Sequence, residues 1–237
     1  DVYKRQGLGS NYYFAKDFFQ ELEVDTVFLN PYKEMIQDKK ILQNWFNNAI
    51  KDDEEVYLIG HSLGGDLARF LSSRSPKVTK LILLDGGYLN LDEIMPLENE
   101  LEAAKAYFDQ HTFTNLEEVI ANEKSQSYYW SENLEEALKN SYRYNSALEK
   151  FELDLDFEKV SYLLELRRVI RSYQRNLKSK NVLFIAPAYD KEPEWRKISL
   201  DKLPQYFDVE LLKNCGHEMY MEHPLEIAHT VNSWINK

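Results

Sequence analysis

A serine in the pattern Gly-x-Ser-x-Gly constrains this 237-residue chain more than any other feature. The apolar run Val56–Ile59 before it is typical of a strand, and the pattern of Leu63–Ser73 after it is helical. A strand that turns so abruptly into a helix forces Ser62 into a strained backbone conformation. Neighbouring backbone must pass close by, and we expect Gly60 and Gly64 to leave room for it.

The start of the following helix suits a nucleophile at Ser62. The Leu63 N–H at this helix N-terminus can hold the negative charge that develops on a carbonyl oxygen under attack. A serine hydroxyl reacts only when a base takes its proton, and the base needs a third group to fix its tautomer. The sequence must therefore supply a histidine and a carboxylate near Ser62.

Among the five histidines, His217 is the best candidate for the base. It follows the last expected strand, Val209–Leu212, on a loop at the carboxyl end of the sheet, where active groups gather. His223 is the local alternative, but it stands just before a helix start at Pro224, where a capping or surface role suffices. His61, beside the serine, is expected to pack.

Two aspartates compete for the role of the acid. Asp190 follows the expected strand Val182–Ala186 and gives the chain order Ser, Asp, His, so we favour it. Asp85 ends the preceding strand and is the alternative acid. Either residue could instead be a carboxylate that only caps a turn.

Strands and helices alternate along both ends of the chain, which predicts a mostly parallel α/β sheet flanked by helices. The expected strands are Val24–Leu29, Val56–Ile59, Val78–Leu84, Val182–Ala186 and Val209–Leu212.

A different pattern occupies the middle of the chain. No glycine or proline occurs between Leu97 and Ala186, and four or five helical patterns fill this stretch. We expect residues 88–178 to form an inserted helical cap that divides the core into residues 1–87 and 179–237.

The sequence gives only weak indications of which cap residues bind the substrate. Tyr128, Trp130 and Tyr142 could line an apolar acyl pocket, although aromatic residues at helical spacing are more often core. Arg167 and Arg171 lie one turn apart and could hold a substrate carboxylate, but a solvated face paired with glutamates explains the same spacing.

Composition excludes several classes of partner. The formal net charge of -11 disfavours nucleic acid and anionic lipid surfaces. No apolar run approaches the roughly 18 residues of a membrane span. The single Cys215 cannot form an internal disulfide, which fits a reducing cytoplasm.

The motif Gly60-His61-Ser62-Leu63-Gly64-Gly65, with Asp190 and Gly216-His217, resembles the α/β-hydrolase superfamily over nearly the whole chain. In that family a glycine-rich loop after the third strand supplies a second oxyanion N–H, and the similar Gly7-Leu8-Gly9 implicates Leu8. The resemblance also implies that the strand leading into Gly7 is missing, so we expect an N-terminally truncated core. A helical insertion is similar to the lid of some family members.

These patterns together predict a serine hydrolase for a small-molecule carboxylic ester or related acyl substrate. Ser62 would attack, His217 would act as base and acid, Asp190 would orient His217, and an acyl-enzyme would form. The Leu8 and Leu63 N–H groups would form the oxyanion hole, and the chemistry needs no metal or cofactor. The alternatives are thioester cleavage, acyl transfer or carbon-carbon bond hydrolysis on the same triad, and a non-catalytic ligand-binding protein of this fold.

Overall fold

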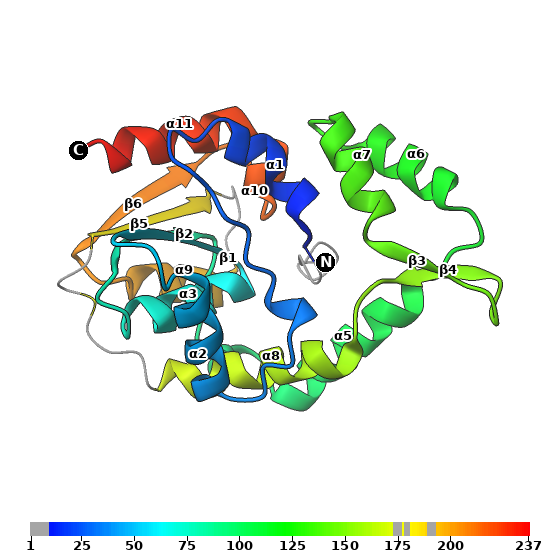
Figure 1. Ribbon diagram of the computed structural model, residues 1–237, viewed down its shortest axis with the longest axis horizontal. Coiled ribbons are helices and arrows are strands. Elements are labelled where there is room, and N and C mark those ends of the chain that lie inside the picture. Colours follow the sequence, from blue (N-terminus) through cyan, green and yellow to red (C-terminus); the bar gives the residue numbers. More distant parts are fainter. Residues whose placement is uncertain (1–9, 173–176, 178–180, 189–192) are drawn as a thin grey trace. The chain divides into compact units, whose positions relative to one another are not determined.

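The chain folds as two compact units, each built from separate segments. The computed structural model describes residues 10–172, 177, 181–188 and 193–237 (Figure 1). Within these, the first unit contains residues 36–97 and 162–217, and the second contains residues 10–35, 98–161 and 218–237.

A parallel four-stranded sheet forms the centre of the first unit. The strand order is β1-β2-β5-β6, and all three neighbouring pairs are parallel. Its strands are β1 (Val56–His61), β2 (Val78–Leu84), β5 (Asn181–Pro187) and β6 (Phe207–Leu212). Four of the five expected strands are therefore confirmed, and their carboxyl ends share one edge of the sheet.

Residues of the central strands are buried as a sheet covered on both faces requires. In β2, the run from Leu81 to Leu84 is at most 1% exposed, and in β5 the run from Val182 to Ala186 is equally buried. Ala68 of helix α3 (Leu63–Ser72) and Phe207 of β6 belong to the same apolar cluster. The sheet is therefore the rigid part of the unit, and it positions the loops at its edge.

Helices surround this sheet within the first unit (Figure 1). Helix α2 begins after Asp38, whose carboxylate accepts hydrogen bonds from the Lys40 and Ile41 N–H groups. Helix α3 follows β1 directly. The helices are α2 (Lys39–Ala49), α3 (Leu63–Ser72), α4 (Leu91–Ile94), α9 (Glu194–Asp201) and most of α8 (Phe157–Arg171).

The expected strand Val24–Leu29 is wrong. This segment is irregular, and Val27 is 81% exposed. A strand exists only where a neighbour pairs with its backbone groups. No described strand pairs with this segment, so its apolar residues alone do not make it a strand.

The second unit is mainly helical and also contains a hairpin. Its elements are α1 (Tyr12–Gln20), the 3-10 helix η1 (Pro31–Lys33), α5 (Leu97–Gln110, whose first residue belongs to the first unit), α6 (Leu116–Gln126), α7 (Glu132–Lys139), β3 (Tyr142–Asn145), β4 (Lys150–Leu153), α10 (Met219–Glu222) and α11 (Pro224–Ile235). Asp17 of α1 accepts hydrogen bonds from Tyr129, Ser131 and Asn133, which fixes the start of α7 to α1.

The hairpin corrects the expectation of an entirely helical insertion. Tyr142 pairs with Leu153, and Tyr144 pairs with Phe151, in an antiparallel ladder. Glu149 in the connecting turn has a φ of 52°, which lets the chain reverse. Alternating aromatic residues favour a strand here, and the absence of glycine concealed the turn. The cap boundaries at 88 and 178 stay a prediction.

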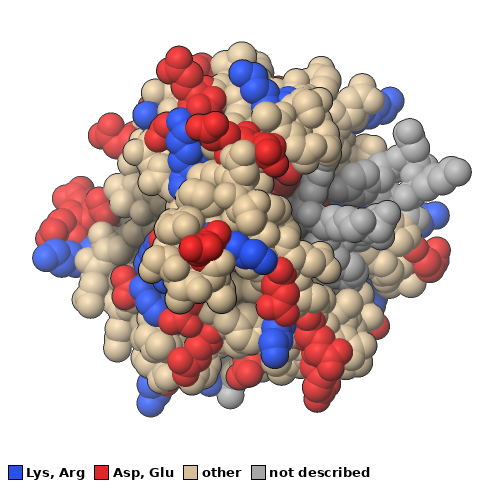
Figure 2. Space-filling view, turned by 90° about the vertical axis from the view of Figure 1, so that its right-hand side faces the viewer, with Lys and Arg blue, Asp and Glu red and all other residues tan. Residues whose placement is uncertain are grey.

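Acidic and basic side chains occur side by side over the face in Figure 2, so neither sign forms a single block there. None of the helices in the described part of the chain has both the length and the apolar character needed to cross a membrane.

Candidate active site

The turn between β1 and α3 has the strained conformation that the motif predicts. Ser62 has a φ of 52° and a ψ of -124°, in a region that L-residues rarely adopt. Its N–H donates to the Leu84 carbonyl at 3.1 Å, and its carbonyl accepts from the Gly65 N–H at 2.9 Å. The serine is thus held at the carboxyl end of the sheet and at the N-terminus of α3.

Close packing around this turn requires glycine at two motif positions. A Cβ atom on Gly60 would lie 2.5 Å from the Gly64 carbonyl oxygen and 2.7 Å from the Ala68 Cβ. A Cβ on Gly65 would lie 2.6 Å from the Gly86 carbonyl carbon. A Cβ on Gly64 would have nothing within 4 Å. The expectation that Gly64 leaves room for neighbouring backbone is therefore wrong.

The turn after β2 is fitted against the serine turn. A Cβ on Gly86 would lie 2.6 Å from the Ser62 backbone nitrogen. Asp85, the residue before it, has a φ of 42° and donates its N–H to the Ile185 carbonyl at 2.8 Å. The end of β2 therefore places the Asp85 carboxylate beside the turn that carries Ser62.

His217 binds this carboxylate directly. Its Nδ1 lies 2.7 Å from Asp85 Oδ2, which is the distance of a charge-assisted hydrogen bond. Asp85 is buried, while His217 keeps a quarter of its side chain exposed. A buried acid that orients a more accessible imidazole is the arrangement that general base catalysis by histidine uses.

Two further residues hold the other oxygen of Asp85. Its Oδ1 accepts the Tyr88 hydroxyl at 3.1 Å and the Arg196 guanidinium at 3.2 Å. Arg196 is 3% exposed and also donates to the Pro187 carbonyl at 3.0 Å. Burial raises the pKa of Asp85, but the hydrogen bond and charge of His217, with the charge of Arg196, outweigh it and hold the pKa below its usual value.

His61 supports the backbone of the base. Its Nε2 lies 2.9 Å from the His217 carbonyl oxygen, and the two rings lie 4.6 Å apart between centroids. Burial, followed by the charge of His217, lowers the pKa of His61 to about 3, so the ring is neutral at pH 7 and Nε2 is its donor. The neighbour of the nucleophile therefore packs on His217, as expected.

The structure brings Ser62, Asp85 and His217 together at one edge of the sheet in the first unit. Asp190 and Leu8 lie outside the described residues. Leu63 is buried and is the first residue of α3, where its N–H belongs to the free amides of a helix start.

Sequence reasoning missed Tyr88 and Arg196. Tyr88 stands three residues after Asp85, and that short spacing is a weak signal for a contact. Arg196 lies 111 residues away, and nothing in its local sequence indicates the pairing. The candidate pocket residues Tyr128, Trp130 and Tyr142 all lie in the second unit, and Tyr128 is 80% exposed. Their role in substrate binding stays a prediction.

Comparisons with known proteins agree with the fold. A family model described as the alpha/beta hydrolase fold matches residues 34–224, while no curated protein matches the sequence significantly. The chain is 14% identical to the peroxisomal alpha-beta-hydrolase Lpx1 from Saccharomyces cerevisiae, with a TM-score of 0.66 over 96% of this chain and 74% of that one.

Two other solved structures have the same fold. One is a thioesterase domain from the curacin biosynthetic pathway, 16% identical, with a TM-score of 0.59 over 84% of this chain and 75% of that one. The other is an esterase from a marine microorganism, also 16% identical, with a TM-score of 0.52 over 83% and 76%. With the family match over residues 34–224, they lead to one assignment: this chain belongs to the alpha/beta hydrolase fold family.

Proposed function

We propose that this chain is a serine hydrolase that cleaves a carboxylic ester or a related acyl compound. The observation that carries the proposal is the 2.7 Å hydrogen bond between His217 Nδ1 and Asp85 Oδ2, beside a serine held in a strained turn. Each of these groups follows a strand of one parallel sheet. Membership of the family indicates a hydrolase in general, and the proposed mechanism is inferred from the residues of the site.

Ser62 Oγ attacks the acyl carbonyl in this mechanism. The Nε2 of His217 takes the serine proton and then returns it to the leaving group, so that an acyl-enzyme forms. Asp85 keeps the Nδ1 proton in place and stabilises the imidazolium. Water, activated by the same imidazole, then releases the acid.

The oxyanion of the tetrahedral intermediate needs preorganised donors. The Leu63 N–H at the start of α3 is one of them, and a donor of this kind contributes about 3 kcal/mol to transition-state stabilisation. We keep the Leu8 N–H as the second donor, on the resemblance of Gly7-Leu8-Gly9 to the family loop.

Asp85 is our preferred acid, in place of Asp190. Tyr88 and Arg196 bind Oδ1 and leave Oδ2 to His217, so the carboxylate is fixed in both position and charge. A carboxylate that only caps a turn needs neither of these partners. Asp190 remains the alternative, supported by the chain order of the family.

The same three groups support ester and thioester cleavage equally well. The esterase and the thioesterase domain that share this fold carry those activities in their names, and neither is similar enough in sequence to decide between them. The ester is the first choice because it needs no recognition of a carrier group. Acyl transfer and carbon-carbon bond hydrolysis are the less favoured alternatives.

Covalent labelling tests the proposal. A fluorophosphonate should form one adduct, found at Ser62 by mass spectrometry, and Ser62→Ala should abolish it. Ser127→Ala removes an exposed hydroxyl elsewhere and should leave labelling intact. Panels of p-nitrophenyl esters and acyl-CoA thioesters then separate the two substrate classes. A folded protein that reacts with neither probe nor substrate would be a binding protein of this fold.

A further inference from the structure

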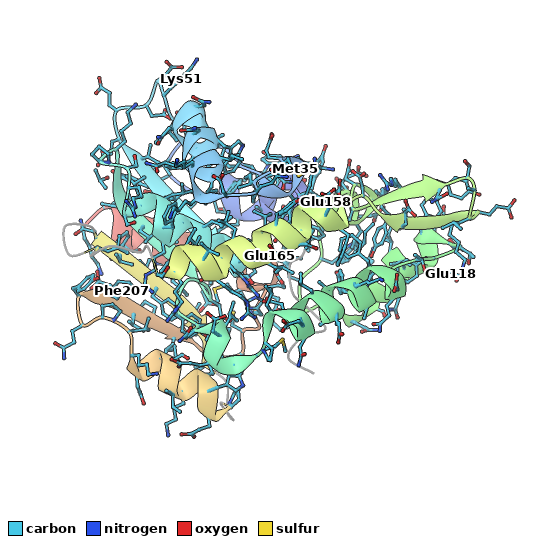
Figure 3. All side chains as sticks on the ribbon, turned by 90° about the horizontal axis from the view of Figure 1, so that it is seen from below. Met35, Lys51, Glu118, Glu158, Glu165 and Phe207 are labelled. Carbon is cyan, nitrogen blue, oxygen red and sulfur yellow. The ribbon has the colours of Figure 1, made fainter. Side chains whose placement is uncertain are left out.

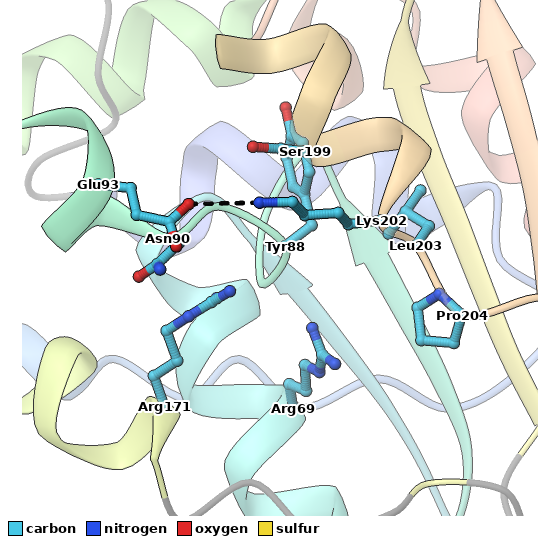
Figure 4. A pocket seen from close by; sticks show the side chains of 9 residues that line it. All are labelled: Arg69, Tyr88, Asn90, Glu93, Arg171, Ser199, Lys202, Leu203 and Pro204. Carbon is cyan, nitrogen blue, oxygen red and sulfur yellow. Dashed lines mark hydrogen bonds and ion pairs between the residues drawn. The ribbon is translucent and has the colours of Figure 1, made fainter.

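A cavity of about 180 Å³ lies within the first unit, away from the serine turn (Figure 4). Helices α3, α4, α8 and α9, the loop that follows β2 and the segment between α9 and β6 contribute its lining residues. None of Ser62, Asp85 and His217 lines it. The cavity is therefore a separate feature of the unit.

Three of its nine lining residues are cationic. Figure 4 shows Arg69 from α3 and Arg171 from α8 pointing toward the same space, with Lys202 and Glu93 on the opposite side. Lys202 Nζ lies 3.4 Å from Glu93 Oε2, and both side chains are more than 60% exposed. Such an exposed pair contributes little to stability, so Lys202 is available to another anion.

The two guanidinium groups are held in place by backbone carbonyls. Arg69 donates to the Gly87 carbonyl at 2.7 Å, and Arg171 donates to the Leu89 carbonyl at 2.7 Å. The Arg69 guanidinium also lies 5.6 Å from the ring centroid of Phe207, at the start of β6 (Figure 3). Neither arginine needs a carboxylate partner to keep its position.

Arg69 carries a poorly solvated positive charge on the lining of the cavity. Its buried Nε has no hydrogen-bond partner among the described residues. Burial, followed by the charge of Arg171, lowers the pKa of Arg69, which means that the two positive charges repel each other in a poorly solvated place. An anion between them would relieve this repulsion.

Nearby acids do not cancel the positive charge. Burial of Asp66 raises its pKa, and the positive charges of Arg167, Arg171 and Arg69 lower it. Burial has the larger effect and brings the pKa of Asp66 to about 6. Among the described residues that line the cavity, Arg69, Arg171 and Lys202 are cationic and Glu93 is acidic, so an excess of one positive charge remains even when Asp66 is also ionised. This excess stands out in a chain whose net charge is -11.

We infer that this cavity binds a small oxoanion, a phosphate or carboxylate group, through Arg69, Arg171 and Lys202. Guanidinium groups bind such anions with paired N–H donors, and the lysine adds a mobile charge. The volume is below the roughly 300 to 1,000 Å³ of drug-sized ligand sites, so the ligand is small.

One lining residue of the cavity also contacts the proposed catalytic acid. Tyr88 lines the cavity, and its hydroxyl donates to Asp85 Oδ1 at 3.1 Å. A bound anion therefore lies one side chain away from the carboxylate that holds His217. The binding site itself does not depend on the proposed hydrolase activity.

Titration calorimetry with inorganic phosphate and with acetate, at constant ionic strength in sodium chloride, tests the site. We expect saturable binding of one anion per chain by the wild-type protein. The double variant Arg171→Gln/Lys202→Gln should bind at least about tenfold more weakly, because it loses two charged donors. Lys197→Gln is the control for Lys202→Gln, since it removes one exposed positive charge from α9, the helix that ends just before Lys202, and lies outside the cavity lining; it should bind like the wild type.

Several outcomes decide the question. Tighter binding of phosphate identifies a phosphate-bearing ligand, and tighter binding of acetate identifies a carboxylate. If the double variant does not fold by circular dichroism, Lys202→Gln alone should still weaken binding, because this exposed lysine is not needed for folding. Absence of saturable binding of both anions, or equal affinity in the wild type and the folded variants, would overturn the site.

Discussion

Replacing Asp85 by asparagine separates the chemistry of the acid from its place in the fold. The carboxylate is 7% exposed and pairs with Arg196, which is 3% exposed. Removing one partner of a buried ion pair costs about 3 to 5 kcal/mol of stability, because the other charge stays behind without compensation. We expect Asp85→Asn to lower the free energy of unfolding by this amount.

Activity should fall much further than stability explains. An asparagine amide next to Nδ1 favours the wrong tautomer of His217, and the equivalent change in a serine protease lowers kcat about 10⁴-fold. Hydrolysis of p-nitrophenyl acetate, measured well below the melting temperature of each variant, gives kcat. Urea unfolding of the same preparations gives the stability.

A second variant removes the stability effect from the comparison. Asp85→Asn/Arg196→Met replaces both charges of the buried pair, so part of the lost stability should return while kcat stays low. Asp190→Asn is the comparison for the alternative acid and should change both quantities little. A larger loss of kcat in Asp190→Asn than in Asp85→Asn, with both proteins folded, would refute the assignment of Asp85.

Three further changes test other parts of the structure. Gly60→Ala should cost several kcal/mol in urea unfolding because its Cβ meets backbone at 2.5 Å, whereas Gly64→Ala meets nothing and should cost less than about 1 kcal/mol; equal costs would contradict the packing of the turn. His61 has a pKa of about 3 in the folded protein against 6.5 otherwise, so only the unfolded chain gains the proton as the pH falls below 6.5, and the protein should lose about 2 kcal/mol between pH 7 and pH 5 through this residue. His61→Gln should show a correspondingly flatter pH dependence, and an unchanged slope would show that His61 is not buried as a neutral ring. Asp17→Ala leaves three hydroxyl and amide donors without their acceptor and should cost about 2 kcal/mol, seen as a lower melting temperature, while Asp25→Ala at an exposed position should not.

Local patterns predicted the parts of the fold that rest on continuous burial. The apolar runs of β2 and β5 are strands because a sheet covered on both faces needs apolar residues at every position. Strand β1 is mostly half-buried, and β6 is mostly exposed, with Asp208 and Glu210 between its apolar residues. Val24–Leu29 has a similar composition, but a strand also needs a neighbour, and that requirement is tertiary. The hairpin Tyr142–Leu153 was missed because its turn uses Glu149 at positive φ in place of glycine.

Two residues of the candidate site could be predicted from local sequence patterns. Ser62 and His217 follow from the residues around them. The choice between two aspartates at consecutive strand ends depends on contacts made by Tyr88 and Arg196, and a single sequence does not carry this information. The sequence likewise did not show that Gly64 faces open space, because this depends on the direction in which a Cβ at that position would point.

The serine turn and the Asp85 turn behave as one module for protein engineering. Gly65 makes room for the backbone of Gly86, and Gly86 makes room for that of Ser62, so the two loops interlock across neighbouring strands. A transplant of residues 60–65 into another scaffold would clash unless residues 85–87 travelled with it. We therefore expect the pair of strand ends to be the unit that can be exchanged between proteins of this fold, since the backbone of each loop packs directly against the other.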